Sequence, residues 1–143
     1  MNTEFIWPIK IYYEDTDAGG VVYYANYLKF YERARTEWLH QMQVNQVEML
    51  NKDIAFAVTK AEVDYLKPAK LNDEVIVKSR ILKVKAASIE FQQQLYLKDE
   101  HTNVLLNKAI IKVACVKLNT FSPCRIPANV KEKLQRILGL VLN

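Results

Sequence analysis

Apolar and polar residues alternate along four long stretches of the chain, and a period of two is typical of β-strands. Many of the apolar positions are β-branched, which strengthens this prediction. The predicted strands cover residues 54–66, 74–84, 88–98 and 104–118. Because parallel neighbours need a crossover of about a dozen residues and these connections are shorter, we expect antiparallel pairing.

Helical spacing replaces this alternation after Asn26, which is predicted to cap the helix. Six mostly aromatic positions recur three or four residues apart and form one stripe: Tyr27, Phe30, Tyr31, Ala34, Trp38 and Gln41. We expect a helix of about 16 residues, or about 24 Å. An opening strand is expected over 5–13, interrupted near Pro8, with a helical turn around 46–50 and a short helix over 128–138.

These elements predict an α+β domain, in which a five-stranded antiparallel sheet wraps the long helix and buries its aromatic stripe. The chain has 143 residues, half of them hydrophobic, so we expect residues 1–143 to form a single domain. Residues 109–116 are apolar on both faces of their strand, which predicts cover by another subunit. We therefore expect a homodimer or homotetramer.

Only two cysteines and two histidines occur, far too few for a disulfide scaffold or a four-cysteine zinc site. We predict no metal and no cofactor, and a reducing, cytoplasmic location. No apolar run approaches the roughly 20 residues of a transmembrane helix. The first residues also lack the features of a signal peptide, so we expect the chain neither to span a membrane nor to be exported.

Charge is distributed unevenly along the chain. Residues 1–66 hold six Lys or Arg against ten Asp or Glu, a net charge of −4, whereas residues 67–143 hold fourteen against six, a net charge of +8. A basic half is typical of proteins with an anionic partner such as a nucleic acid, a lipid headgroup or a phosphorylated small molecule. Because the chain has no Arg-rich stripe and no RNP-like motif, we predict no nucleic-acid binding.

The strongest candidate for chemistry is an acidic loop, Asp15-Thr16-Asp17-Ala18-Gly19-Gly20, between the opening strand and the long helix. A helix N-terminus offers unpaired N–H groups that can stabilise an oxyanion, and an upstream carboxylate can act beside it as base or nucleophile. Asp and Gly before a helix are also common in ordinary turns and caps. A calcium-loop reading fails because the later acidic positions of that motif are missing.

Residues 11–23, Ile-Tyr-Tyr-Glu-Asp-Thr-Asp-Ala-Gly-Gly-Val-Val-Tyr, are followed by Asn26-Tyr27 and by Phe-Tyr-Glu-Arg-Ala-Arg-Thr-Glu at 30–37. This combination resembles the hotdog-fold acyl-CoA thioesterases of the 4-hydroxybenzoyl-CoA thioesterase class, and most closely the YbgC-like, Tol-Pal-associated branch. The resemblance covers nearly the whole chain, from about Trp7 to Pro127. It implies a hotdog fold and hydrolysis of short- or medium-chain acyl-CoA.

The resemblance also implies roles for individual residues. Asp17 would attack the thioester carbonyl or activate a water, and the backbone amide of Tyr24 would receive the oxyanion. Gly19 and Gly20 would let the loop approach the thioester closely. The branch often has histidine at position 24, so this chain departs from the pattern in its side chain but keeps the amide.

Substrate contacts are predicted from the same resemblance. Tyr23 and Tyr27 would line the acyl pocket, while Lys85 and Ser88, with Lys83 nearby, would bind the nucleotide end of CoA. Acyl-carrier protein is a second candidate thioester donor, and a non-catalytic docking module for envelope or lipid-synthesis proteins is an alternative from another class. Glu32 and Arg35, three residues apart on the helix, are expected to form an ion pair or to anchor the helix to a loop.

Overall fold

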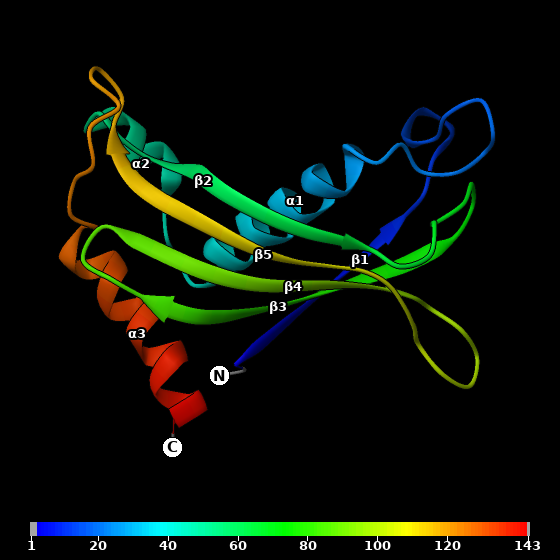
Figure 1. Cartoon of the computed structure of the whole chain (residues 1–143). Coiled ribbons are helices and arrows are strands. Elements are labelled where there is room, and N and C mark those ends of the chain that lie inside the picture. The colour runs from blue at the N-terminus through cyan, green and yellow to red at the C-terminus, as the bar shows by residue number, and fades with distance from the viewer. Residues whose placement is uncertain (1–2, 143) are drawn as a thin grey trace.

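The computed structural model describes residues 3–142, with side chains up to residue 139. Its five strands form one sheet in which every neighbouring pair is antiparallel, in the order β1-β3-β4-β5-β2 (Figure 1). The strands are β1 (Glu4–Lys10), β2 (Ile54–Tyr65), β3 (Glu74–Val84), β4 (Ser88–Leu97) and β5 (Val104–Lys117). The predicted α+β architecture is confirmed. Pro8 does not interrupt β1, because β1 is an edge strand where a missing N–H is tolerated.

The long helix α1 (Asn26–Gln41) lies along the concave side of the sheet, which curves around it (Figure 1). A 3-10 turn, η1 (Tyr13–Asp15), precedes α1, and the short α2 (Gln46–Asn51) follows it. The last helix, α3 (Ala128–Leu142), lies near the turn between β3 and β4 and runs four residues longer than predicted. Within residues 3–142, no helix is both long and apolar enough to cross a membrane.

Alternation along β3 and β4 explains why the sheet wraps the helix. Every second side chain of these strands is buried on the side of α1, where the aromatic stripe also points. The ring of Trp38 stacks on Phe5 of β1 at 5.8 Å between centroids and meets Phe91 of β4 edge-on at 6.3 Å. One helix face thus ties the edge strand β1 to the centre of the sheet.

The outward face of the sheet is less apolar than the sequence suggests. In β5, Ile110 is half-buried and Lys112 is exposed, whereas Val116 is buried and pairs with Pro123 of the following segment. Part of the apolar surface of residues 109–116 is therefore covered within the chain, whereas the sequence predicted that another subunit covers it.

A buried polar network crosses the core between α1 and β4. Arg35 is only 8% exposed, and its Nη1 donates to Oε1 of Gln93 at 2.8 Å. Nε2 of Gln93 in turn donates to the Tyr31 carbonyl and to Oγ of Ser79. Burial lowers the pKa of Arg35 to about 10. The predicted Glu32–Arg35 ion pair is wrong, because Arg35 turns inward and Glu32 accepts a bond from Thr36 instead.

Tyr31 offers a test of this polar core. Its hydroxyl donates to Oδ1 of Asn107 at 2.6 Å, and both side chains are buried. The Tyr31→Phe substitution leaves that oxygen without its donor, so the free energy of unfolding should fall by roughly 1–3 kcal/mol at pH 8. Guanidinium denaturation measures the change, and Tyr96→Phe, on a half-buried tyrosine of the outward face, should stay within about 0.5 kcal/mol.

The same variant should respond differently to alkali. Burial raises the pKa of Tyr31 well above its ordinary value near 10, so the unfolded chain loses this proton first. The stability contributed by the neutral phenol is complete below pH 10 and is lost as the pH rises beyond it. At pH 11 the wild type should therefore lose up to about 1.4 kcal/mol that the phenylalanine variant retains. An unchanged difference between pH 8 and pH 11 would contradict the burial of this hydroxyl.

Candidate active site

The acidic loop lies within residues 11–25, a segment that is fastened on both sides of the loop before it reaches α1. The Ile11 amide donates to the Asp73 carbonyl at 2.9 Å, and the Val22 amide donates to the Ala69 carbonyl at 2.9 Å. Asp15 is buried, and its Oδ2 accepts the Tyr12 amide at 2.9 Å. Of the two loop aspartates, Asp15 therefore holds the loop together.

Asp17 has the opposite environment, because its side chain is exposed at the tip of the loop. Its backbone closes a tight turn, with its amide donating to the Val21 carbonyl and its carbonyl accepting the Gly20 amide. Oδ1 accepts the Gly19 amide at 2.8 Å. Within residues 3–142, Oδ2 has no hydrogen-bond partner, so a fixed carboxylate presents one open oxygen.

The two glycines have separate reasons to be glycine. A Cβ on Gly19 would lie 3.3 Å from Oδ1 of Asp17 and would crowd the carboxylate. Gly20 has φ +78°, a left-handed conformation that a side chain would strain. Both glycines thus keep the turn tight around Asp17.

The entrance to α1 leaves the amides of Tyr24 and Ala25 without an acceptor among the described residues. Tyr23 donates its amide to the Asp15 carbonyl at 3.1 Å, and Asn26 donates its amide to the Tyr23 carbonyl at 2.8 Å. Between them, the Tyr24 amide has no acceptor in the part of the chain that the structure describes. It lies at the positive end of the helix dipole, which suits an oxyanion donor.

Asn26 does not cap the helix as predicted. The cap residue is Ala25, and Nδ2 of Asn26 instead donates to the Asp15 carbonyl at 2.9 Å. This carbonyl therefore accepts two bonds, one from the Asn26 side chain in the first turn of α1 and one from the Tyr23 amide before the helix. Sequence reasoning missed Asp15 and Asn26 as anchors of the loop, although both lie within the motif itself.

An aromatic group adjoins this entrance. A cavity of about 180 Å³ is lined by Val22, Tyr24, Tyr27, Tyr65, Leu66, Lys67 and Pro68. The Tyr65 hydroxyl donates to the Tyr24 carbonyl at 3.1 Å, while Tyr23 is exposed beside it. Tyr27 is 2% exposed, and its hydroxyl accepts the Ala69 amide at 3.0 Å. Burial raises the pKa of Tyr27, so this hydroxyl stays neutral.

Lys85 and Ser88 line a second cavity together. With Lys60, Lys83 and Lys112 they line a cavity of about 300 Å³, in which Glu62 and Glu90 are the only acidic neighbours. This cavity lies at the end of β3, whereas the acidic loop contacts its beginning (Figure 1). Eleven residues of strand at about 3.3 Å each span roughly 35 Å, so one chain does not bring Lys85 beside Asp17.

Metal-binding side chains do not gather anywhere in residues 3–142, where no three or more His, Cys, Asp and Glu lie close enough to hold an ion.

Comparisons with known proteins agree on one family. Residues 12–134 match the family described as "Thioesterase-like superfamily". An acyl-CoA thioesterase YbgC of Haemophilus influenzae is 43% identical over 92% of this chain and 94% of its own length. An acyl-CoA thioester hydrolase YbgC of Escherichia coli is 41% identical over 91% of this chain and 96% of its own.

Solved structures share the fold. The crystal structure of a DHNA-CoA thioesterase from Staphylococcus aureus superimposes with a TM-score of 0.89, covering 97% of this chain and 93% of that one at 23% identity. The curved sheet and its enclosed helix are therefore those of the hotdog fold.

Proposed function

The chain belongs to the thioesterase-like superfamily and is an acyl-CoA thioester hydrolase, and on this premise we propose that Asp17 is its catalytic carboxylate. The observation that carries the proposal is that the loop leading into α1 holds two free groups seven residues apart. One is the exposed Oδ2 of Asp17, and the other is the unclaimed amide of Tyr24. A thioester needs a nucleophile or base on one side of its carbonyl and a donor for the emerging oxyanion.

In this reaction water adds to the acyl carbon, the carbon–sulfur bond breaks, and a carboxylate and the CoA thiol leave. Asp17 either attacks the carbonyl itself or removes a proton from the attacking water, and its bond from Gly19 fixes its orientation in both cases. The conformation of Gly20 keeps the turn narrow, so the thioester can come close to the Tyr24 amide.

For the substrate, we assign the acyl group to the aromatic entrance near Tyr23 and Tyr27, and the CoA phosphates to the basic cavity of Lys85 and Ser88. Lysine ammonium groups bind phosphate as point charges. The separation of this cavity from Asp17 within one chain means that a second copy has to supply it.

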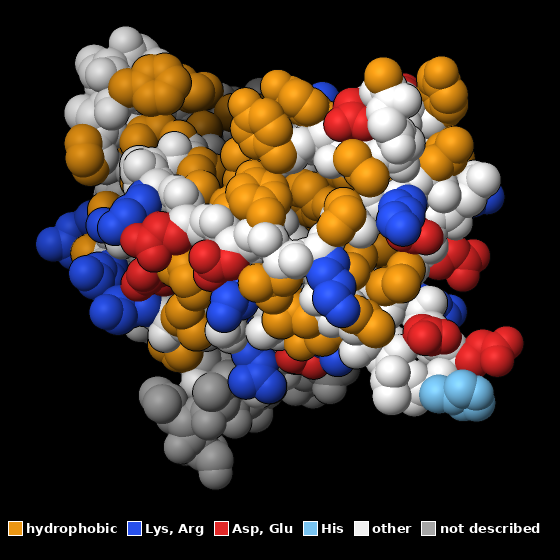
Figure 2. Space-filling model, turned by 45° about the vertical axis from the view of Figure 1, so that its right-hand side comes forward, with side chains coloured by type: hydrophobic (Ala, Val, Ile, Leu, Met, Phe, Trp, Pro, Cys, Tyr) orange, Lys and Arg blue, Asp and Glu red, His pale blue; other side chains and the backbone are white. Residues whose placement is uncertain are grey.

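We propose that β2 makes the contact between copies. β2 pairs with β5 on one side only, and an unpaired edge of twelve residues is a template for another strand. Val58 on this edge is 51% exposed, and Figure 2 shows hydrophobic side chains spread across the upper part of the face that it draws. Antiparallel pairing of two β2 edges would turn the basic end of one chain toward the acidic loop of the other.

Sedimentation equilibrium measures the size of the assembly. Two copies of the 16.6 kDa chain suffice for this arrangement, and four would add contact between outward sheet faces. A monomer at micromolar concentration would contradict the shared site.

We propose three further assignments, which concern location, domain organisation and functional partners. We place the protein in the cytoplasm, where its two cysteines, with sulfurs 3.5 Å apart and unbonded, stay reduced. We also propose that residues 1–143 work as one domain and that the protein acts alongside the Tol-Pal system, as its YbgC-like sequence suggests.

A hydrolysis panel tests the substrate. Acyl-CoA thioesters of increasing length should be cleaved with a preference for short or medium chains, since the aromatic cavity holds only about 180 Å³. The preferred acyl group should then be offered on acyl-carrier protein at the same concentration. Because the basic cavity suits the nucleotide phosphates of CoA, kcat/KM should be higher for the CoA thioester. Faster cleavage of the carrier-protein thioester would make that protein the donor instead.

A further inference from the structure

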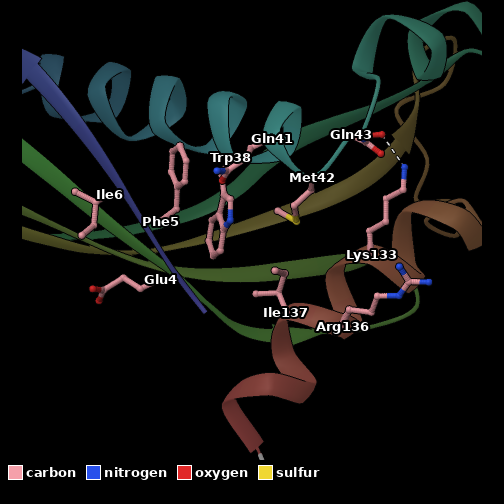
Figure 3. Close-up of a pocket in the computed structure, with 10 residues that line it drawn as sticks. All are labelled: Glu4, Phe5, Ile6, Trp38, Gln41, Met42, Gln43, Lys133, Arg136 and Ile137. Atoms are coloured by element: carbon pink, nitrogen blue, oxygen red, sulfur yellow. Dashed lines mark hydrogen bonds between the residues drawn. The ribbon is translucent and has the colours of Figure 1, made fainter. Parts of the chain in front are cut away.

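A larger cavity lies at the other end of α1, away from the acidic loop (Figure 3). It has a volume of about 650 Å³, within the range of roughly 300–1,000 Å³ typical of small-molecule sites. Its walls come from β1, the C-terminal end of α1 and α3, and most of the length of α1, about 24 Å, separates it from Asp17. The hydrolytic site described above makes no use of it.

One part of this cavity is apolar and preformed. Trp38 is 2% exposed, and its ring is held against Phe5 at an interplanar angle of 6°. Phe5 also stacks on Trp7, so the wall is fixed by three aromatic rings. Met42 and Ile137 extend it into the space between α1 and α3 (Figure 3).

The opposite part of the cavity is cationic. Lys133 and Arg136 are one turn apart on α3 and lie together on the side away from Phe5 (Figure 3). Nζ of Lys133 donates to the Gln43 carbonyl at 2.7 Å, which leaves two of its three donors free. Arg136 is bonded to Glu132 in an exposed ion pair, which is weak enough to exchange for a ligand.

One acidic side chain lines this cavity, and its partner is a cation outside the lining. Glu4 lies at the apolar end, and its carboxylate pairs with Arg80 at 3.2 Å. The cavity therefore combines an aromatic wall and a positive end in one open cleft, which fits a molecule with an apolar chain and a single anionic head.

We propose that this cavity is a second ligand site that binds a free fatty acid, with its carboxylate at Lys133 and Arg136 and its chain along Phe5 and Met42, beside the buried ring of Trp38. The planar guanidinium of Arg136 matches a carboxylate in geometry. Acyl-CoA hydrolysis releases acids of this class, so the proposal rests on the thioesterase function for the identity of its ligand. It does not depend on the role of Asp17.

Trp38 provides the readout. The chain has two tryptophans, so a Trp7→Phe background leaves Trp38 as the sole reporter. Titration with 12-bromododecanoate, below its micelle concentration, should quench Trp38 fluorescence saturably, because bromine quenches on contact. Unlabelled dodecanoate should reverse the quenching, and 1-dodecanol should compete at least tenfold less well because it lacks the charge.

Charge variants decide the location. Lys133→Gln with Arg136→Gln should weaken binding by roughly tenfold to a hundredfold, the loss expected for hydrogen bonds to charged groups. Lys117→Gln with Arg125→Gln removes two exposed cations outside the cavity and should leave binding unchanged. Circular dichroism checks that each variant folds.

Several results would overturn the proposal: quenching that never saturates, equal binding by the Lys133/Arg136 variant, or equal competition by the alcohol. The quenching assay contains no thioester, so its outcome does not depend on whether Asp17 is catalytic. Asp17→Asn should bind the bromo acid as the wild type does. Product inhibition of hydrolysis without quenching of Trp38 would place the acid at the acidic loop instead.

Discussion

Replacing Asp17 by asparagine is expected to lower kcat by about 10² to 10⁴ if the carboxylate acts as a general base, and by more if it is the nucleophile. The amide keeps a side-chain oxygen that can accept the Gly19 amide, so the turn survives. What is lost is the negative charge and basicity of the open oxygen. Steady-state hydrolysis of the best acyl-CoA of the panel measures the effect.

Glu14 supplies the matched control, because it is an exposed carboxylate in the same loop. Glu14→Gln removes the same charge without touching the turn of Asp17 and should change kcat less than twofold. Both variants should keep the wild-type circular dichroism spectrum and thermal midpoint. Full hydrolysis by Asp17→Asn would end its assignment as the catalytic carboxylate and would place that role on another side chain.

The second large effect is expected at the Tyr24 amide. Tyr24→Pro removes the N–H that has no acceptor within the described residues, and the loss of one oxyanion donor costs about 10² to 10³ in kcat. Proline is tolerated near the first turn of a helix, where amides are unpaired. Tyr24→Ala keeps the amide and removes only an exposed ring, so its kcat should stay within about fivefold of wild type.

The contrast between the two variants is the test. Equal loss in both would assign the effect to the aromatic side chain, and equal activity in both would remove the amide from the mechanism. A thermal midpoint close to that of the wild type separates a missing donor from a damaged helix.

Much of the fold follows from local patterns. The alternation along residues 74–84 predicts the exact limits of β3, because one face of that strand is buried and its turns are short. The spacing of the aromatic stripe likewise predicts α1, although Gln41, at the end of the stripe, is exposed. The order of strands in the sheet was not predicted, because pairing of β1 with β3 depends on contacts some seventy residues apart.

Side-chain partners were harder to predict than elements. The position of Arg35 suggests an exposed ion pair, but the curved sheet places Gln93 and Phe91 against that face of the helix and draws the guanidinium inward. Asn26 has the residue type of a cap, yet the Asp15 carbonyl offers its side chain a better-placed acceptor. Both differences arise from tertiary contacts that override local preference.

The sequence motif indicates which residues belong to the candidate site, but it does not indicate how far apart its two parts lie in one chain. Asp17, Gly20 and Tyr24 are neighbours in sequence and lie in one loop, although bonds to Asp73 and Ala69 hold that loop in place. Lys85 and Ser88 share a cavity as neighbours in one turn, but their distance from the loop depends on the length of β3, which the motif does not encode.

The order of the elements also has a consequence for synthesis. α1 ends at Gln41, yet the last of the strands that cover its aromatic stripe ends at Lys117. At roughly 5–20 residues per second, a ribosome needs roughly 4 to 15 s to make the intervening chain. During that interval the sheet that covers Trp38 and Phe30 is incomplete. The nascent polypeptide is therefore expected to be most prone to aggregation midway through translation.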